Sequence, residues 1–214
     1  MRHRSAHLIS LCAAGAALMV GGCSAESPAA RAGAGASAST APSSSPSAGL
    51  LGSHSATLAA ARAEAARRPV AVQVPGYPGF SPVQAFTADP VTRGLDLPKN
   101  ARTVAWWGGG TMPGEPSGTA VLAAHVSYQG SKGPFTHLRS LPAGAIVRVR
   151  RADGSVRAFR LVGRRELVKS ALGQQDLFRA TGPAQLALIT CGGTFNAATR
   201  NYSDNVIVYA VPVA

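Results

Sequence analysis

From Pro69 onward, apolar residues come in short runs, and glycine, proline or a charged turn ends most of them. Short β-branched and apolar runs bounded by such breakers predict strands rather than long helices. The predicted strands are 70–74, 81–86, 103–107, 119–125, 145–150, 156–162, 186–190 and 205–211. Residues 152–154 read Ala-Asp-Gly, a hairpin signal between two of the runs, and 135–141 has helical spacing. We therefore predict an all-β, barrel-like domain of about eight strands with one or two short helices.

The first 23 residues have the pattern of an export signal. Arg2 and Arg4 form a basic start, and 8–20 is an uncharged, mostly apolar stretch of 13 residues. A membrane-spanning helix needs roughly 20 residues, so this stretch fits the core of a signal peptide better. Small residues then lead into Cys23, which resembles a bacterial lipobox. We predict a lipoprotein-type signal over 1–22 and a lipid on Cys23; an ordinary signal peptide or an uncleaved anchor are the alternatives.

The composition of residues 23–68 predicts a tether between the signal segment and the domain. Ala, Ser, Pro and Gly dominate the segment, and it has no periodic apolar face, so most of it cannot offset the entropy of ordering. Residues 56–68 could form a short Ala-rich helix. The domain then spans 69–214, and we expect it to be held at the outer face of the cytoplasmic membrane.

Of the three cysteines, only Cys191 remains as a candidate nucleophile. Cys12 would leave with the signal and Cys23 would be lipidated, which leaves Cys191 without a disulfide partner. Cys191 follows the apolar run 186–190 and precedes two glycines, so we expect the strand to end there and to present a thiol nucleophile at the rim of the core. The run 119–125 likewise ends in a reactive residue, His125. No Cys/His cluster has metal-ligand spacing, so we predict no cofactor and no metal, calcium included.

The formal charge of +12 favours anionic surroundings without choosing among them. From Pro69 onward, 15 Lys and Arg face 7 Asp and Glu, so the domain carries 15 − 7 = +8. Several arginines alternate with apolar residues in the predicted hairpin and would line its solvated face; they are Arg148, Arg150, Arg157, Arg160, Arg164 and Arg165. No interleaved aromatic residues accompany them, so nucleic-acid binding is not predicted.

Three stretches resemble the sortase family, and its class F most of all. They are Ala120-Val121-Leu122-Ala123-Ala124-His125, Leu188-Ile189-Thr190-Cys191-Gly192-Gly193 and Tyr202-Ser203-Asp204-Asn205-Val206-Ile207-Val208. Residues 94–98 (GLDLP) and Trp106-Trp107 with Pro113-Gly114-Glu115 are similar to class F as well. The resemblance covers about 69–214 and keeps the motifs in order.

The resemblance implies an eight-stranded β-barrel and a cysteine transpeptidase. Such an enzyme cleaves a C-terminal sorting signal of LPXTG type after the Thr and transfers the acyl group to an amine of the cell wall. Cys191 would form the thioester and His125 would move the protons. A guanidinium would stabilise the oxyanion. Thr190 and Trp107 are candidates for the substrate groove, and we expect a monomer.

The arginine departs from the family's pattern. In many sortases it stands at the start of the last strand, where this chain reads Ser203-Asp204-Asn205. Arg200 is the only arginine after Cys191, so we assign it the role, with Asn205 as a supporting donor. Two other functions stay open: a hydrolytic cysteine peptidase or thioesterase with the same dyad, and a cationic lipoprotein that binds the envelope without catalysis.

Overall fold

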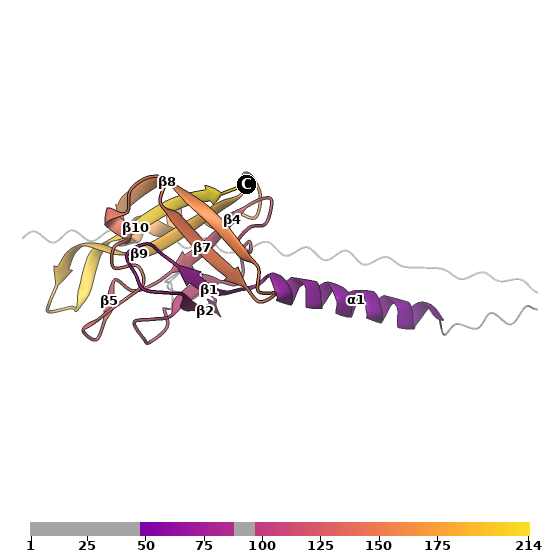
Figure 1. Cartoon of the computed structure of the whole chain (residues 1–214). Coiled ribbons are helices and arrows are strands. Elements are labelled where there is room, and N and C mark those ends of the chain that lie inside the picture. The colour runs from indigo at the N-terminus through magenta and orange to yellow at the C-terminus, as the bar shows by residue number, and fades with distance from the viewer. Residues whose placement is uncertain (1–47, 88–96) are drawn as a thin grey trace, which may run out of the picture. The chain divides into compact units, whose positions relative to one another are not determined.

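Eight strands close into a barrel in the computed structural model, which describes residues 48–87 and 97–214 (Figure 1). Around the barrel the order is β1-β2-β3-β4-β9-β10-β8-β7. The elements are α1 (Ala48–Arg67), β1 (Pro69–Gln73), β2 (Ser81–Phe86), β3 (Val104–Trp107), β4 (Thr119–Ala123), β5 (Ser127–Tyr128), β6 (Ser131–Lys132), η1 (Leu138–Ser140), β7 (Ile146–Arg151), β8 (Val156–Val168), η2 (Lys169–Gln174), β9 (Gln185–Asn196) and β10 (Asn201–Pro212). The prediction of an all-β barrel is confirmed.

Two hydrophobic clusters cover the two faces of the barrel wall. The first takes side chains from all eight strands, so it fills the interior, and Phe135 and Phe159 are its largest fully buried members. The buried strand residues of the second cluster come from β4, β9 and β10, at alternate positions of those strands, so this cluster lies on their outer face. Leu172 of η2 and Leu177 cover this second cluster. The sequence did not predict η2 or the outer cluster.

The expectation that the strand ends at Cys191 is wrong. β9 continues to Asn196, and β10 begins at Asn201, so the two strands form a hairpin that extends beyond the barrel (Figure 1). The glycines fit the strand because its register shifts opposite Tyr202 and Asp204, where Gly193 adopts a φ of +74°. A Cβ at Gly193 would collide with the side chains of Ser203 and Asp204. The glycines therefore form a bulge within the strand.

The helix before the barrel is longer than predicted. α1 begins at Ala48 instead of residue 56, and its last carbonyls meet the turn between β7 and β8. Ala152 N donates to Arg68 O and Asp153 N donates to Ala66 O, both at 2.9 Å. None of the helices in the described residues is long and apolar enough to cross a membrane. The predicted signal over 1–22, Cys23 and the tether up to residue 47 lie outside the described residues.

The turn from β7 to β8 confirms the Asp-Gly hairpin. Arg150 pairs with Val156, and Gly154 has the positive φ that the turn requires. The Asp153 carboxylate accepts hydrogen bonds from the hydroxyl and the backbone N–H of Ser155, which lower the pKa of this carboxyl. The hydrogen bonds of Asp153 with Ser155 and the positive φ of Gly154 therefore stabilise the turn through its own residues.

Arg151 ties the same hairpin to the loop after β3. It is only 4% exposed, and its Nε and Nη2 donate to Pro113 O at 3.0 and 2.5 Å. Glu115 lies 3.7 Å from Arg151 and 3.4 Å from Arg67, so one carboxylate joins the hairpin to α1. Burial, and after it the charge of Arg157, lowers the pKa of the Arg151 guanidinium.

We expect Arg151→Met to destabilise the barrel by about 1.5–3 kcal/mol, because Pro113 O loses both of its charged donors and Glu115 keeps only its contact with Arg67. Urea unfolding of the variant measures this loss. Arg157→Met is the matched control, since Arg157 is exposed on the same hairpin, and it should change stability by about 0.5 kcal/mol or less. Equal effects of the two substitutions would contradict a specific role for Arg151.

Candidate active site

The parallel pairing of β4 and β9 places His125 next to Cys191. Every pair in this ladder is 66 residues apart, from Thr119 opposite Gln185 to Ala123 opposite Ile189. His125 and Cys191 keep the same spacing, 191 − 125 = 66, two residues beyond the last pair. Cys191 is two residues after Ile189 on β9 and therefore shares the face of the outer hydrophobic cluster, and His125 lines the same cavity as Cys191. Two distant motifs thus meet through strand register.

Thr190 fastens the two strands at this point. Its hydroxyl donates to Ala124 O at 2.8 Å, and Ala124 N donates to Ile189 O at 3.1 Å. Thr190 is 3% exposed and adjoins Cys191, while Ala124 adjoins His125. The groove role predicted for Thr190 stays a prediction. The structure shows a buried link between the neighbours of the two reactive residues.

We expect Thr190→Val to lower the free energy of unfolding by about 1–3 kcal/mol and to lower kcat, because it removes the hydroxyl that donates to Ala124 O and leaves that carbonyl without this donor. Thr119→Val is a matched control on β4. Thr119 is fully buried, and among the described residues its hydroxyl is the buried side-chain group without a hydrogen-bond partner. That substitution should leave stability unchanged or raise it. Thermal unfolding and steady-state kinetics of both variants measure these effects, and an equal loss in both would contradict the proposed link.

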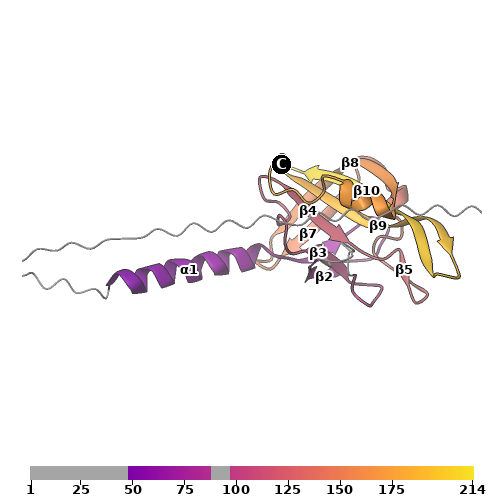
Figure 2. The same ribbon diagram turned by 180° about the vertical axis from the view of Figure 1, so that it is seen from behind.

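A cavity of about 540 Å³ contains the candidate catalytic side chains. The loop after β4 with the β5–β6 hairpin forms one wall, and the β9–β10 hairpin forms another; these elements lie at the same end of the barrel in both views (Figures 1 and 2). The lining residues are Leu97, His125, Val126, Ser127, Tyr128, Gln129, Gly130, Cys191, Phe195, Arg200, Asn201 and Tyr202. The structure therefore brings Cys191, His125 and Arg200 to one cavity.

Two neighbours orient the His125 ring. Its Nε2 lies 3.0 Å from Pro98 O, and because a carbonyl only accepts, Nε2 carries the hydrogen and donates it. Nδ1 is then the nitrogen left to exchange protons. The Tyr128 ring lies 4.9 Å from the imidazole, centroid to centroid, at 30°. Neither Pro98 nor Tyr128 was predicted as a site residue; the spacing of Tyr128, three residues after His125, was the available signal.

Arg200 and Asn205 approach the site differently. Arg200 is exposed at the tip of the β9–β10 hairpin, and its φ of +50° lies in the left-handed region. Asn205 is 8% exposed and stands directly opposite Cys191 on β10, so its side chain shares the face of the thiol. The chain thus places one exposed cation and one largely buried side-chain amide near the nucleophile.

Trp107 lies in the outer hydrophobic cluster rather than in the wall of the cavity. Its ring meets that of Phe178 edge to face, with centroids 4.8 Å apart. Leu97 belongs to the cavity wall and also packs on this cluster. Trp107 therefore continues the apolar face that leads to the cavity, and its substrate role stays a prediction.

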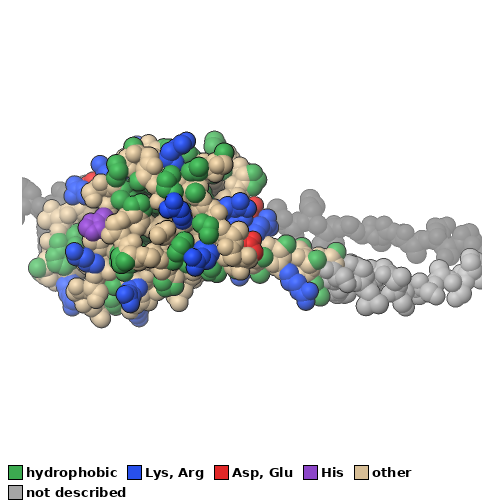
Figure 3. Space-filling view, viewed as in Figure 1, with side chains coloured by type: hydrophobic (Ala, Val, Ile, Leu, Met, Phe, Trp, Pro, Cys, Tyr) green, Lys and Arg blue, Asp and Glu red, His purple; other side chains and the backbone are tan. Residues whose placement is uncertain are grey.

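Charge around the barrel is mostly basic. Figure 3 shows many more Lys and Arg than Asp and Glu side chains on one face. In the described part of the chain, no group of three or more His, Cys, Asp and Glu side chains could hold a metal ion. The cavity itself presents a thiol, an imidazole and a guanidinium, from Cys191, His125 and Arg200.

Comparison with known proteins identifies the domain. A family model described as a sortase domain matches residues 82–213. Sortase C1 of GBS pilus island 1, from Streptococcus agalactiae, is 21% identical with a TM-score of 0.52; the match covers 67% of this chain and 63% of that one, less than two thirds of its length. Sortase C-1 from Actinomyces oris is 20% identical over 68% of this chain and 73% of its own, with a TM-score of 0.53.

A third structure, the SrtA sortase from Actinomyces oris, is 19% identical over 68% of this chain and 79% of its own, with a TM-score of 0.52. A search of curated proteins gives no match. At these identities the solved structures establish the fold alone. The family model covers well over half of the chain, including both reactive residues, and on that ground the chain belongs to the sortase family.

Proposed function

We propose that this chain is a cysteine transpeptidase of sortase class F that cleaves an LPXTG-type sorting signal after the Thr and transfers the acyl group to a cell-envelope amine. The observation that carries the proposal is the meeting of Cys191, His125 and Arg200 in one cavity. The constant 66-residue offset between β4 and β9 holds the first two side by side. A thiol, a proton carrier and a cation are the groups that acyl transfer through a thioester requires.

Acylation begins from a Cys191 thiolate and a His125 imidazolium, which carries the proton of the thiol on Nδ1. The thiolate attacks the Thr carbonyl carbon. The C–S bond forms, and the carbonyl oxygen takes up negative charge, which Arg200 stabilises. The oxyanion then reforms the carbonyl while the C–N bond breaks, and His125 gives its proton to the leaving Gly nitrogen. The products are a thioester on Cys191 and a free amine.

Deacylation uses the same groups in reverse. The acceptor amine attacks the thioester carbonyl, and neutral His125 takes its proton through Nδ1, since Nε2 donates to Pro98 O. Collapse of the oxyanion expels Cys191 as thiolate and leaves a new amide bond. Water in place of the amine gives hydrolysis, so the acceptor decides between transfer and peptidase activity.

The cavity offers apolar surface to the unreactive part of a sorting signal. Leu97, Val126 and Phe195 line it together with Cys191. Apolar side chains of the peptide can pack against these residues while its Thr carbonyl reaches the thiol. The proposed lipid on Cys23 and the segment up to residue 68 would hold this site, as a monomer, near secreted substrates.

The test is intact mass spectrometry of the purified full chain with an LPXTG-type peptide, with and without triglycine. A product joined to triglycine supports the transpeptidase. Hydrolysis at the same rate under both conditions favours the peptidase instead. No product with a series of sorting peptides, together with a Cys191 thiol that does not react with alkylating agents, favours a non-catalytic envelope-binding protein. Added calcium and added chelator should both leave the rate unchanged.

A further inference from the structure

A second cavity of about 500 Å³ lies between η1 and the strands β8 and β10. Its lining residues are Arg139, Ser140, Leu141, Pro142, Ala143, Leu161, Gly163, Arg164 and Val208. None of these lines the cavity that holds Cys191. Its volume falls within the range of about 300–1,000 Å³ found for small-molecule sites. The proposed transpeptidase reaction makes no use of it.

The hollow has a structural cause. β8 and β10 shift register so that Tyr209 pairs with Gly163 and Ala210 with Leu161, which leaves Val162 bulged. Gly163 adds no side chain, and a Cβ built there would meet nothing within 4 Å. On the other edge of β8, Gly144 N donates to Leu161 O at 2.8 Å, which holds the loop after η1 in place. The opening is therefore part of the fold.

The cavity has an apolar floor and a cationic rim. Leu161 and Val208 belong to the interior core, at 3% and 2% exposed, and form the floor. Arg139 and Arg164 supply the rim, and they contact each other because Arg164 Nη1 donates to Arg139 O. The Arg139 Nε donates to Glu166 at 2.8 Å, and Glu166 is not a lining residue. Each guanidinium has five N–H donors, so both keep donors free for a ligand.

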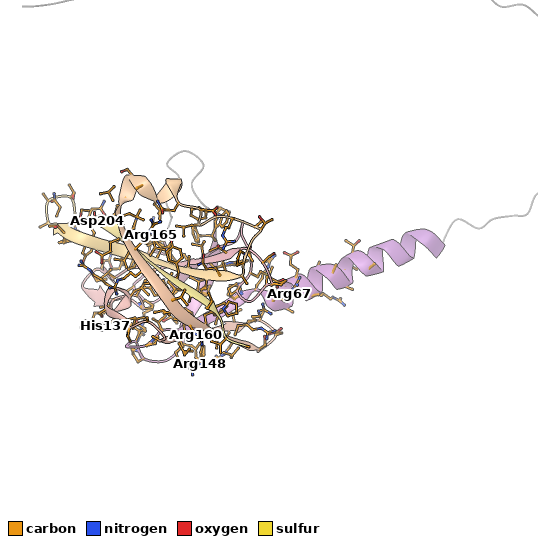
Figure 4. The ribbon with its side chains drawn as sticks, turned by 90° about the horizontal axis from the view of Figure 1, so that it is seen from above. Arg67, His137, Arg148, Arg160, Arg165 and Asp204 are labelled. Carbon is orange, nitrogen blue, oxygen red and sulfur yellow. The ribbon has the colours of Figure 1, made fainter. Side chains whose placement is uncertain are left out.

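The surroundings are basic as well. Arg148 and Arg160 are exposed on β7 and β8, where they are diagonal neighbours in the ladder (Figure 4). The fork of donors on a guanidinium matches the oxygen geometry of phosphate, Arg139 and Arg164 both line the cavity, and the apolar floor can take the carbon atoms next to the phosphate. A negatively charged phosphate ester with a short carbon chain fits both features.

We propose that this cavity binds the phosphate group of a glycerol phosphate, either free or as the headgroup of an anionic phospholipid. Arg139 and Arg164 bind the phosphate oxygens, and Leu161 and Val208 contact the glycerol carbons. The site does not depend on Cys191 and would operate whether or not the transpeptidase function holds.

Two probes distinguish the sources: calorimetric titration with sn-glycerol 3-phosphate, and co-sedimentation with phosphatidylglycerol vesicles beside phosphatidylcholine vesicles, all on the full chain. Arg139→Gln/Arg164→Gln should weaken binding by about tenfold or more, because charge-assisted hydrogen bonds are lost. The control variant Arg148→Gln/Arg160→Gln removes the same number of positive charges outside the cavity, and it should weaken binding much less.

Saturable binding of the free phosphate ester supports a small-anion site, and binding only to phosphatidylglycerol vesicles supports the headgroup. In both cases the Arg139/Arg164 double variant must lose more binding affinity than the Arg148/Arg160 double variant. Equal losses in the two pairs would overturn the proposal in favour of diffuse attraction by the basic face. Absence of binding to both probes would overturn it too. Thermal unfolding of each variant shows that it is folded.

Discussion

Cys191→Ala is expected to lower the rate of transpeptidation at least about a thousandfold, to the background of the assay. The thioester forms on this sulfur, and no other cysteine occurs between residue 24 and the C-terminus. Cys191 is partly exposed in the cavity beside His125, so alanine removes the nucleophile without opening a hole in the buried core. The fold should persist, with a melting temperature close to that of the wild type.

The measurement is a time course of intact mass with the sorting peptide and triglycine. Wild-type protein should show a transient mass increase from the acyl-enzyme, and this species should be missing in Cys191→Ala. His125→Gln is the companion variant: the thiol remains, but proton transfer fails, and the rate should fall by about 10²–10⁴-fold. Product formation by Cys191→Ala at the wild-type rate would exclude a thioester mechanism on this residue.

The strands could be predicted, and Cys191 and His125 could be located beside them, because this information is local. Each strand is a run of apolar residues with breakers beside it, and Cys191 and His125 each lie next to such a run. The Asp-Gly turn likewise depends on Asp153, Gly154 and their own backbone. These features need only neighbours in the sequence.

Features that depend on partners far along the chain were missed. The strand containing Cys191 continues through Gly192 and Gly193 because β10 pairs with it, and a glycine pair by itself indicates a loop. The contact of Pro98 O with His125 crosses 27 residues and comes from a backbone carbonyl, which no side-chain pattern reveals. η2 was missed because its Leu172 is buried only by the outer face of β4 and β9. Long-range packing decided each of these elements.

Strand register determines the position of Asn205 but not that of Arg200. Asn205 could be placed opposite Cys191 once the two strands were known to pair. Arg200 lies in the connection between them, where its side chain is exposed, so pairing does not fix its direction. Arg200 lines the cavity because of the course that the chain takes between β9 and β10.

Arg200→Ala is therefore expected to lower kcat/KM by about 10²–10³-fold, the loss typical of one oxyanion donor. Arg200→Lys should recover part of this activity, because lysine keeps the positive charge. The recovery should be incomplete, because lysine lacks the planar set of N–H donors of a guanidinium. Arg200→Gly separates function from folding. The φ of +50° costs a non-glycine residue about 1–2 kcal/mol, so glycine should preserve or raise stability while activity falls.

Asn205→Ala provides the decisive comparison, because Asn205 is the other candidate donor near the thiol. If Arg200 stabilises the oxyanion, Arg200→Ala should mainly lower kcat, and Asn205→Ala should cost about tenfold or less. The reverse order, with Arg200→Ala nearly as active as the wild type and Asn205→Ala inactive but folded, would assign the oxyanion to the Asn205 amide. A buried neutral donor opposite the nucleophile would then replace the arginine that stands at the start of the last strand in many sortases, where this chain has Ser203-Asp204-Asn205. Steady-state kinetics of both variants at saturating peptide distinguish the two assignments.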